Sequence, residues 1–155
     1  YNPEEFIYCT NLIREKIQDA AIGTDVMVGF PGETDKEFEN TYSLLKQSPL
    51  TYYHVFPYSR RRGTTASNVP DQVPLEVTKV RSKILRDQGI ERKKQFYSKF
   101  VGQKVSVIVE TRLKATSRNY ISVKLLDGNL KVGDEACVEI KKVEGELALA
   151  QANFH

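Results

Sequence analysis

Ten residues, Asp25 to Thr34 (DVMVGFPGET), restrict the fold of the first half of the chain more than any other stretch. The segment Val26–Val28 is apolar without alternation, which predicts a short strand covered on both faces. Two glycines and a proline follow, and they predict a sharp turn. Thr34 and Glu37 then have the spacing of a capping box, which predicts that a helix begins here.

This strand, turn and helix allow two interpretations. In α/β proteins, a glycine-rich turn at the carboxyl end of a buried strand is a common place for a ligand. A tight connection without any ligand has the same residue pattern. The residues of this stretch leave both interpretations open.

The flanking residues predict the order helix, strand, helix, strand. The first helix is expected to begin at Asn2 and to end near Asp19. The second is expected from about Asp35 to Gln47, followed by a strand over residues 52–57. The expected inward side chains are Phe6, Cys9, Ile13 and Ile17 in the first helix, and Phe38, Tyr42 and Leu45 in the second.

That order predicts parallel strands joined by right-handed crossovers. Two strands form neither a barrel nor a doubly wound sheet. Either the sheet is very small, or the chain is cut from a larger α/β domain.

Three consecutive arginines, Arg60 to Arg62, follow the second strand. Guanidinium groups can grip phosphate or carboxylate, but a solvated loop has the same composition. Residues 66–74 are expected to be an irregular connector. Residues 75–99 are expected to be a long polar helix that Gly89 kinks or divides. Its expected apolar stripe is Val77, Val80, Ile84 and Leu85, and its basic residues are Arg81, Lys83, Arg86, Arg92, Lys93, Lys94 and Lys99.

From Gly102 onward, apolar and polar residues alternate in several short runs. Turn residues separate these runs: Ser117, Asp127–Gly128, Gly133–Asp134 and Gly145. This pattern predicts four or five antiparallel strands in a small barrel of the oligonucleotide-binding type. The basic residues of this region, with one aromatic among them, are Arg112, Lys114, Arg118, Tyr120, Lys124 and Lys131. The basic side chains suit contact with an RNA backbone, and the aromatic ring suits stacking on a base. A barrel that only packs on its neighbour is the alternative.

Charge and cysteine content restrict the partners further. Residues 1–75 carry 7 Lys/Arg and 10 Asp/Glu, whereas residues 76–155 carry 16 and 10, within a net charge of +3. The basic second half indicates either a polyanionic partner or a solvated surface.

Cys9 and Cys137 lie far apart, which argues against a disulfide framework or zinc site, and each is expected to be a small buried residue. No apolar run approaches the roughly 20 residues of a membrane helix, and a cytoplasmic location is expected.

Four stretches, in this order, resemble successive motifs of the radical S-adenosylmethionine methylthiotransferases. They are Asp25–Thr34, His54–Arg60 (HVFPYSR), Arg62–Thr64 (RGT) and Pro70–Pro74 (PDQVP). The basic barrel resembles the TRAM domain of these enzymes, a small β-barrel that binds RNA. The segment HVFPYS is closest to the branch that acts on N6-threonylcarbamoyladenosine beside the tRNA anticodon.

The resemblance implies three parts. Residues 1–75 would be the carboxyl-terminal part of the radical enzyme's α/β barrel, residues 76–99 a connecting helix, and residues 100–155 an antiparallel TRAM-like barrel. The implied cofactor-binding residues are Met27, Val28, Gly29, Glu33, Phe56 and Tyr58. The implied RNA-binding residues are Arg60, Arg61, Arg112, Lys114, Arg118, Tyr120 and Lys124. Arg62 departs from the family pattern, which usually has proline there.

The resemblance also implies S-adenosylmethionine and two four-iron, four-sulfur clusters in the full-length enzyme. This chain lacks the CxxxCxxC motif, so we expect it to bind neither cofactor, to be inactive alone, and to need the missing amino-terminal part of the same enzyme. The expected nucleic-acid partner is the anticodon region of tRNA. Two alternatives remain: a stand-alone RNA-binding module, and a related methylthiotransferase acting on another tRNA adenosine or a ribosomal protein.

Overall fold

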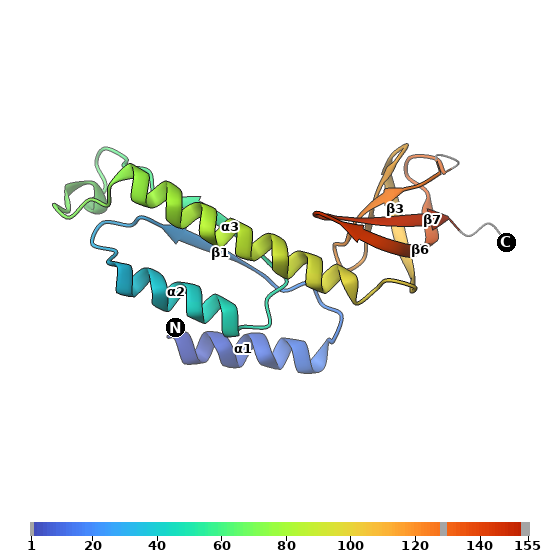
Figure 1. The fold of residues 1–155 in the computed structure, drawn as a ribbon, viewed down its shortest axis with the longest axis horizontal. Coiled ribbons are helices and arrows are strands. Elements are labelled where there is room, and N and C mark those ends of the chain that lie inside the picture. Colours follow the sequence, from blue (N-terminus) through green and yellow to red (C-terminus); the bar gives the residue numbers. More distant parts are fainter. Residues whose placement is uncertain (1, 128–129, 153–155) are drawn as a thin grey trace. The chain divides into compact units, whose positions relative to one another are not determined.

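The structure, a computed structural model, describes residues 2–127 and 130–152 (Figure 1). The chain divides into two compact units, Tyr1–Gly89 and Ile90–His155. Each unit is described separately below.

The first unit contains helices and a small sheet, and the second contains a barrel. The helices are α1 (Pro3–Lys16), α2 (Asp35–Gln47), the short 3-10 helix η1 (Thr65–Asn68) and α3 (Leu75–Ser98). The strands are β1 (Gly23–Val28), β2 (Tyr52–Pro57), β3 (Lys104–Thr111), β4 (Lys114–Ser117), β5 (Ser122–Leu125), β6 (Glu135–Glu144) and β7 (Leu147–Ala152). Helix α3 begins in the first unit and ends in the second.

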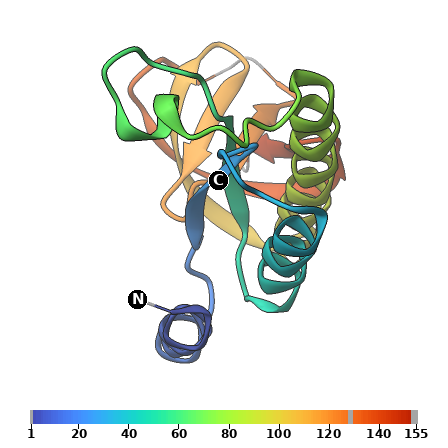
Figure 2. The ribbon, with the colours of Figure 1, turned by 90° about the vertical axis from the view of Figure 1, so that its left-hand side faces the viewer.

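Strands β1 and β2 pair in parallel, as the sequence predicts, with Gly23 opposite Tyr52 and Val28 opposite Pro57. Figure 2 shows α2 and α3 on the same side of these two strands. The core of the unit accordingly lies between this face of the sheet and the two helices. Its buried residues are Ile22, Val26, Val28, Leu45, Leu50, Tyr53 and Leu85.

The prediction that β1 is covered on both faces is wrong. Val26 and Val28 are buried, but Met27 between them is 53% exposed. Successive side chains of a strand point to opposite faces, and among the described residues the helices cover one face of this sheet. Phe56, opposite Met27 on β2, is likewise 49% exposed.

Helix α1 begins as predicted but packs differently. Asn2 and Glu5 form a reciprocal capping box. The helix ends at Lys16, earlier than predicted, and its predicted inward face is largely exposed, including Ile13 and Cys9. Among the described residues of this helix, Phe6 packs against the core of the unit, and the rest of its predicted inward face is only partly covered.

Helix α2 confirms its predicted bounds and its start. The Thr34 hydroxyl accepts from the Glu37 amide, and the Glu37 carboxylate accepts from the Thr34 amide at 2.7 Å. That backbone hydrogen bond, followed by the one from the Thr34 hydroxyl, holds the pKa of Glu37 below its usual value. The predicted inward residues Phe38, Tyr42 and Leu45 all pack in the core.

Helix α3 is continuous through Gly89, so this glycine does not divide the helix. A Cβ at Gly89 would lie 3.2 Å from Cε2 of Tyr53, which shows that glycine serves close packing here. The predicted apolar stripe is partly wrong, because Val80 and Ile84 are exposed, whereas Leu85 is buried and Val77 is half-buried. The buried face consists instead of Thr78, Arg81, Ser82, Leu85 and Gly89.

Strands β3 to β7 form a closed barrel in the order β3-β4-β5-β7-β6. The predicted alternation is confirmed, with Val107, Val109, Val123, Leu125, Val138 and Ile140 buried. The prediction of purely antiparallel pairing is wrong, because β5 and β7 pair in parallel to close the barrel.

Cys137 on β6 is exposed rather than buried, and the predicted turn residue Gly128 lies outside the described residues. Across residues 2–127 and 130–152, we find no helix with the length and apolar content to cross a membrane.

Candidate functional site

The turn after β1 is built on two glycines in the left-handed region, Gly29 at φ 75° and Gly32 at φ 86°. A Cβ on Gly29 would meet Oγ1 of Thr78 at 2.3 Å, so only glycine fits against α3. The Gly29 amide donates to Oε2 of Glu33 at 2.8 Å, and the Gly32 amide donates to the carbonyl of Asp71 at 2.7 Å. The turn is therefore fixed by its own side chain and by later parts of the chain.

Arg81 anchors this turn to α3. Its Nη1 donates to Oε2 and to the carbonyl of Glu33, at 2.6 and 2.9 Å, and its Nη2 donates to Oδ1 of Asp35 at 2.7 Å. The guanidinium also lies over the Phe38 ring, 5.3 Å from its centroid. Burial lowers the pKa of Arg81, but the hydrogen bonds to Asp35 and Glu33 outweigh this effect and the net shift is upward.

From the sequence, Arg81 is expected among the basic residues outside the apolar stripe of the helix, but in the structure it lies on the buried face. The residue is 5% exposed. Its helical spacing from Thr78 and Leu85 is the signal that could have revealed it, but only with the buried face of α3 already known. Glu33, predicted to bind a cofactor, uses its carboxylate in contacts within the protein.

The other predicted cofactor-binding residues gather at the carboxyl end of the two strands. Met27 and Phe56 are register partners with exposed side chains, whereas the Val28 side chain is fully buried in the core. The Tyr58 amide donates to the Val28 carbonyl at 2.8 Å, and its ring lies 5.4 Å from that of Phe30. The buried Tyr58 hydroxyl has no hydrogen-bond partner among the described residues.

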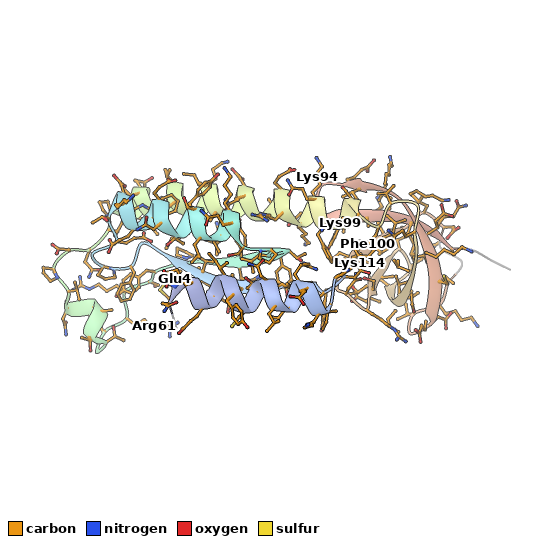
Figure 3. All side chains as sticks on the ribbon, turned by 90° about the horizontal axis from the view of Figure 1, so that it is seen from below. Glu4, Arg61, Lys94, Lys99, Phe100 and Lys114 are labelled. Atoms are coloured by element: carbon orange, nitrogen blue, oxygen red, sulfur yellow. The ribbon has the colours of Figure 1, made fainter. Side chains whose placement is uncertain are left out.

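In the barrel, two predicted RNA-binding lysines lie side by side. Lys114 of β4 is directly opposite Lys124 of β5, and both are exposed. Like charges at opposite positions destabilise a sheet, and a bound anion relieves the repulsion. Arg112 is exposed in the turn between β3 and β4, just before Lys114. Lys114 is labelled in Figure 3.

The turn between β4 and β5 presents Tyr120, which is 72% exposed. Its φ of 60° makes it the one non-glycine residue with positive φ in the described part of the chain. Such a backbone persists only where the surroundings hold it, and it is common at functional sites. The Tyr120 amide donates to the Ser117 carbonyl at 2.9 Å, and the Ile121 amide donates to the Ser117 hydroxyl at 2.9 Å.

Tyr97 of α3, which the sequence analysis does not identify, holds the same turn from inside. It is 1% exposed. Its hydroxyl donates to the Tyr120 carbonyl at 3.2 Å and accepts from the Ser122 amide at 3.0 Å. Its place among Phe96 and Phe100 in an otherwise polar helix is the sequence signal for this contact.

Arg118, beside Tyr120 on this turn, already has an ionic partner. Its Nη2 lies 3.1 Å from Oε1 of Glu135, which also accepts from the Ser106 hydroxyl at 2.7 Å. The Ser106 hydrogen bond, and then Arg118, hold the pKa of Glu135 below its usual value. Arg118 is nevertheless exposed, so its guanidinium reaches solvent as well as Glu135.

No family model matches the chain. It is 40% identical, over 140 residues, to the threonylcarbamoyladenosine tRNA methylthiotransferase MtaB of Rickettsia prowazekii, covering 90% of this chain and 32% of the relative. The protein of the same name from Aquifex aeolicus is 37% identical over 133 residues, with 86% and 32% covered. The tRNA-2-methylthio-N(6)-dimethylallyladenosine synthase of Geobacillus kaustophilus is 43% identical over 116 residues, with 74% and 22% covered.

The similarity thus extends over most of this chain but over about a third or less of each relative. These relatives bear the names of two kinds of tRNA methylthiolating enzyme, and the motif resemblance described above indicates the same group. By its sequence, the chain belongs to the family of tRNA methylthiotransferases.

Proposed function

We propose that this chain is the carboxyl-terminal part of a tRNA methylthiotransferase of the threonylcarbamoyladenosine branch, and that its barrel binds the tRNA near the anticodon. The barrel is then a TRAM domain, and the first unit is part of a radical S-adenosylmethionine barrel. The observation that carries the RNA-binding role is the β4–β5 hairpin, where an exposed, conformationally fixed Tyr120 accompanies the opposed pair Lys114 and Lys124. An aromatic face and basic side chains together suit single-stranded RNA.

We assign part of the S-adenosylmethionine site to the carboxyl end of the two strands. Met27 and Phe56 offer exposed apolar side chains, and a polar ligand group would satisfy the buried Tyr58 hydroxyl. Val28 would contribute through its main chain, and Glu33 would act by fixing the turn at Gly29. In the family, this cofactor supplies the radical that removes a hydrogen from the substrate.

The iron–sulfur clusters would be held by other residues of the full-length enzyme. The chain has two cysteines, and the described residues contain no group of three or more His, Cys, Asp or Glu placed to hold a metal ion. A cluster of this kind requires several cysteine thiolates close together. We therefore assign to this chain a role in binding tRNA and lining the cofactor site.

Fluorescence anisotropy with a labelled anticodon stem-loop RNA, repeated across a salt series, tests the RNA-binding role. The double variant Lys114→Ala, Lys124→Ala should reduce the slope of log K against log salt by about 0.7 for each phosphate that the two lysines neutralise. Tyr120→Ala should weaken binding by about 1–3 kcal/mol with little change in slope, because stacking releases no counterions.

The matched control is Lys141→Ala, Lys142→Ala on β6. It removes the same charge from the same barrel, but these lysines are ion-paired with Glu139 and Glu144. We expect its salt slope to stay near that of the unmodified chain. Equal slopes for the two double variants would show that the hairpin is not the RNA-binding face.

A further inference from the structure

The loop after β2 borders a hollow of about 400 Å³ that is open to solvent. Its lining residues are Arg60, Arg62, Gly63, Ser67 and Asn68, so two of them are arginines and none carries an apolar side chain. A nucleobase or other apolar ring would find no suitable surface there, whereas a small anion would. Arg61, between the two lining arginines, is not part of the lining and is labelled in Figure 3.

The two lining arginines have no anionic partner in the described part of the chain. Arg81 and Arg118, in contrast, are each paired with a carboxylate. Two neighbouring cations repel one another, and an anion bound between them removes this repulsion. The hollow therefore has the charge of an anion site.

The backbone of this loop is fixed by hydrogen bonds. The Thr64 hydroxyl donates to the Arg61 carbonyl at 2.9 Å, and the Ser67 hydroxyl donates to the Thr64 carbonyl at 2.7 Å. The side-chain Nε2 of Gln72 donates to the carbonyls of Ala66 and Val69, at 3.1 and 2.7 Å. A ligand thus needs to order only the arginine side chains, which keeps the entropic cost of binding low.

We propose that Arg60 and Arg62 form a site for one phosphate group, gripped between two guanidinium forks. Arg61 takes no part in it. The inference rests on the proposed function in one respect: the phosphate is expected to be a phosphodiester of the RNA backbone. A free phosphorylated small molecule offers the same chemistry, and the experiment separates the two sources.

The test compares three single variants of the full chain, Arg60→Gln, Arg61→Gln and Arg62→Gln, which all remove one positive charge. Binding of the labelled anticodon stem-loop RNA is measured by anisotropy across a salt series. Arg60→Gln and Arg62→Gln should each weaken binding about tenfold, the effect of removing one charge-assisted hydrogen bond. Arg61→Gln should change affinity less than about twofold.

A double variant, Arg60→Gln with Arg62→Gln, shows whether the two side chains share one phosphate. If they do, the salt slope falls by about 0.7 in each single variant and by the same amount in the double. The decrease in affinity of the double variant should also be smaller than the product of the two single decreases. Circular dichroism and the thermal midpoint confirm that each variant is folded.

Inorganic pyrophosphate, titrated by calorimetry, is the second probe. The chain could bind pyrophosphate but not RNA, with pyrophosphate binding abolished by Arg60→Gln and Arg62→Gln and preserved by Arg61→Gln. This result would support the site, with a small molecule as the source of the phosphate, and would contradict the proposed function. Equal effects of all three arginine variants on RNA, with no pyrophosphate binding, would overturn the site while leaving RNA binding by the barrel intact.

Discussion

Arg81 occupies a position on α3 that would ordinarily carry an apolar side chain. Its neighbours on the same helix face, Thr78 and Leu85, are buried. A cation is stable there because Glu33 and Asp35 offer carboxylates from the turn after β1. One buried residue therefore fixes the geometry of a turn that lies almost fifty positions earlier in the sequence.

We expect Arg81→Leu to lower the free energy of unfolding by about 3 kcal/mol, because the nearly buried carboxylate of Glu33 loses its cation. Lys83→Leu, which removes the same charge from an exposed ion pair with Asp87, should cost about 0.5 kcal/mol or less. Urea unfolding followed by circular dichroism measures both. Equal decreases would mean that the buried pair does not stabilise the unit.

The pair can also be removed as a whole. Glu33→Leu combined with Arg81→Leu leaves no buried unpaired charge, because the remaining partner Asp35 is fully exposed, so the double variant should be more stable than Arg81→Leu alone. A double variant that is less stable than either single variant would argue that the turn needs the ion pair itself.

At the level of the elements, the bounds of helices and strands are predicted best where the sequence signal is local. The bounds of α2 and β2 are confirmed, because a capping box starts the helix and Pro49 prevents its continuation after Ser48. The buried face of α3 could not be predicted in the same way. It carries polar and glycine residues whose role depends on a turn and a strand far away in the sequence.

The predicted cofactor-binding and RNA-binding residues differ in the same way. The carboxyl ends of β1 and β2 could be recognised as a candidate site from the strand and turn pattern alone. The exposure of Met27 could not, because it depends on which elements cover the sheet. The burial of Tyr97, and with it the fixed conformation of Tyr120, depends on a contact between α3 and the barrel. The aromatic residues around Tyr97 indicate that it is buried, but no local pattern identifies the turn that it contacts.

Tyr97→Phe removes only the hydroxyl that bridges the β4–β5 turn. We expect it to lower the free energy of unfolding by about 1–3 kcal/mol, because the Ser122 amide loses its acceptor. It should also weaken binding of the stem-loop RNA without changing the salt slope, because it loosens Tyr120 and removes no charge. Tyr8→Phe, at a 67% exposed tyrosine of α1, is the control and should change neither quantity. Full RNA affinity in Tyr97→Phe would show that Tyr120 needs no such support.

On the scale of the whole molecule, the two units differ in whether their sheets have free edges. The barrel is closed, whereas the sheet of the first unit consists, among the described residues, of β1 and β2 alone. Each of these strands keeps an unpaired edge, and Met27 and Phe56 are exposed on the open face of the sheet. Such edges and faces favour association with another chain.

The chain should therefore self-associate reversibly as its concentration rises, and Phe56→Lys should shift this association to higher concentration. Leu113→Lys is the matched control, since Leu113 is 45% exposed on the barrel, which has no free edge. Sedimentation velocity over a concentration series measures the effect. A chain that stays monomeric throughout the series would show that the open sheet does not recruit a partner.

The closure of the barrel by the parallel pair β5 and β7 also determines how it assembles. Strands β3, β4 and β5 form one piece through neighbouring pairings, and β6 and β7 form a second as a hairpin. The pairings β3–β6 and β5–β7 join these pieces, and both close long loops of the chain. Because non-local pairing is slow, we expect the pairing of these two pieces with one another to limit the rate of barrel folding.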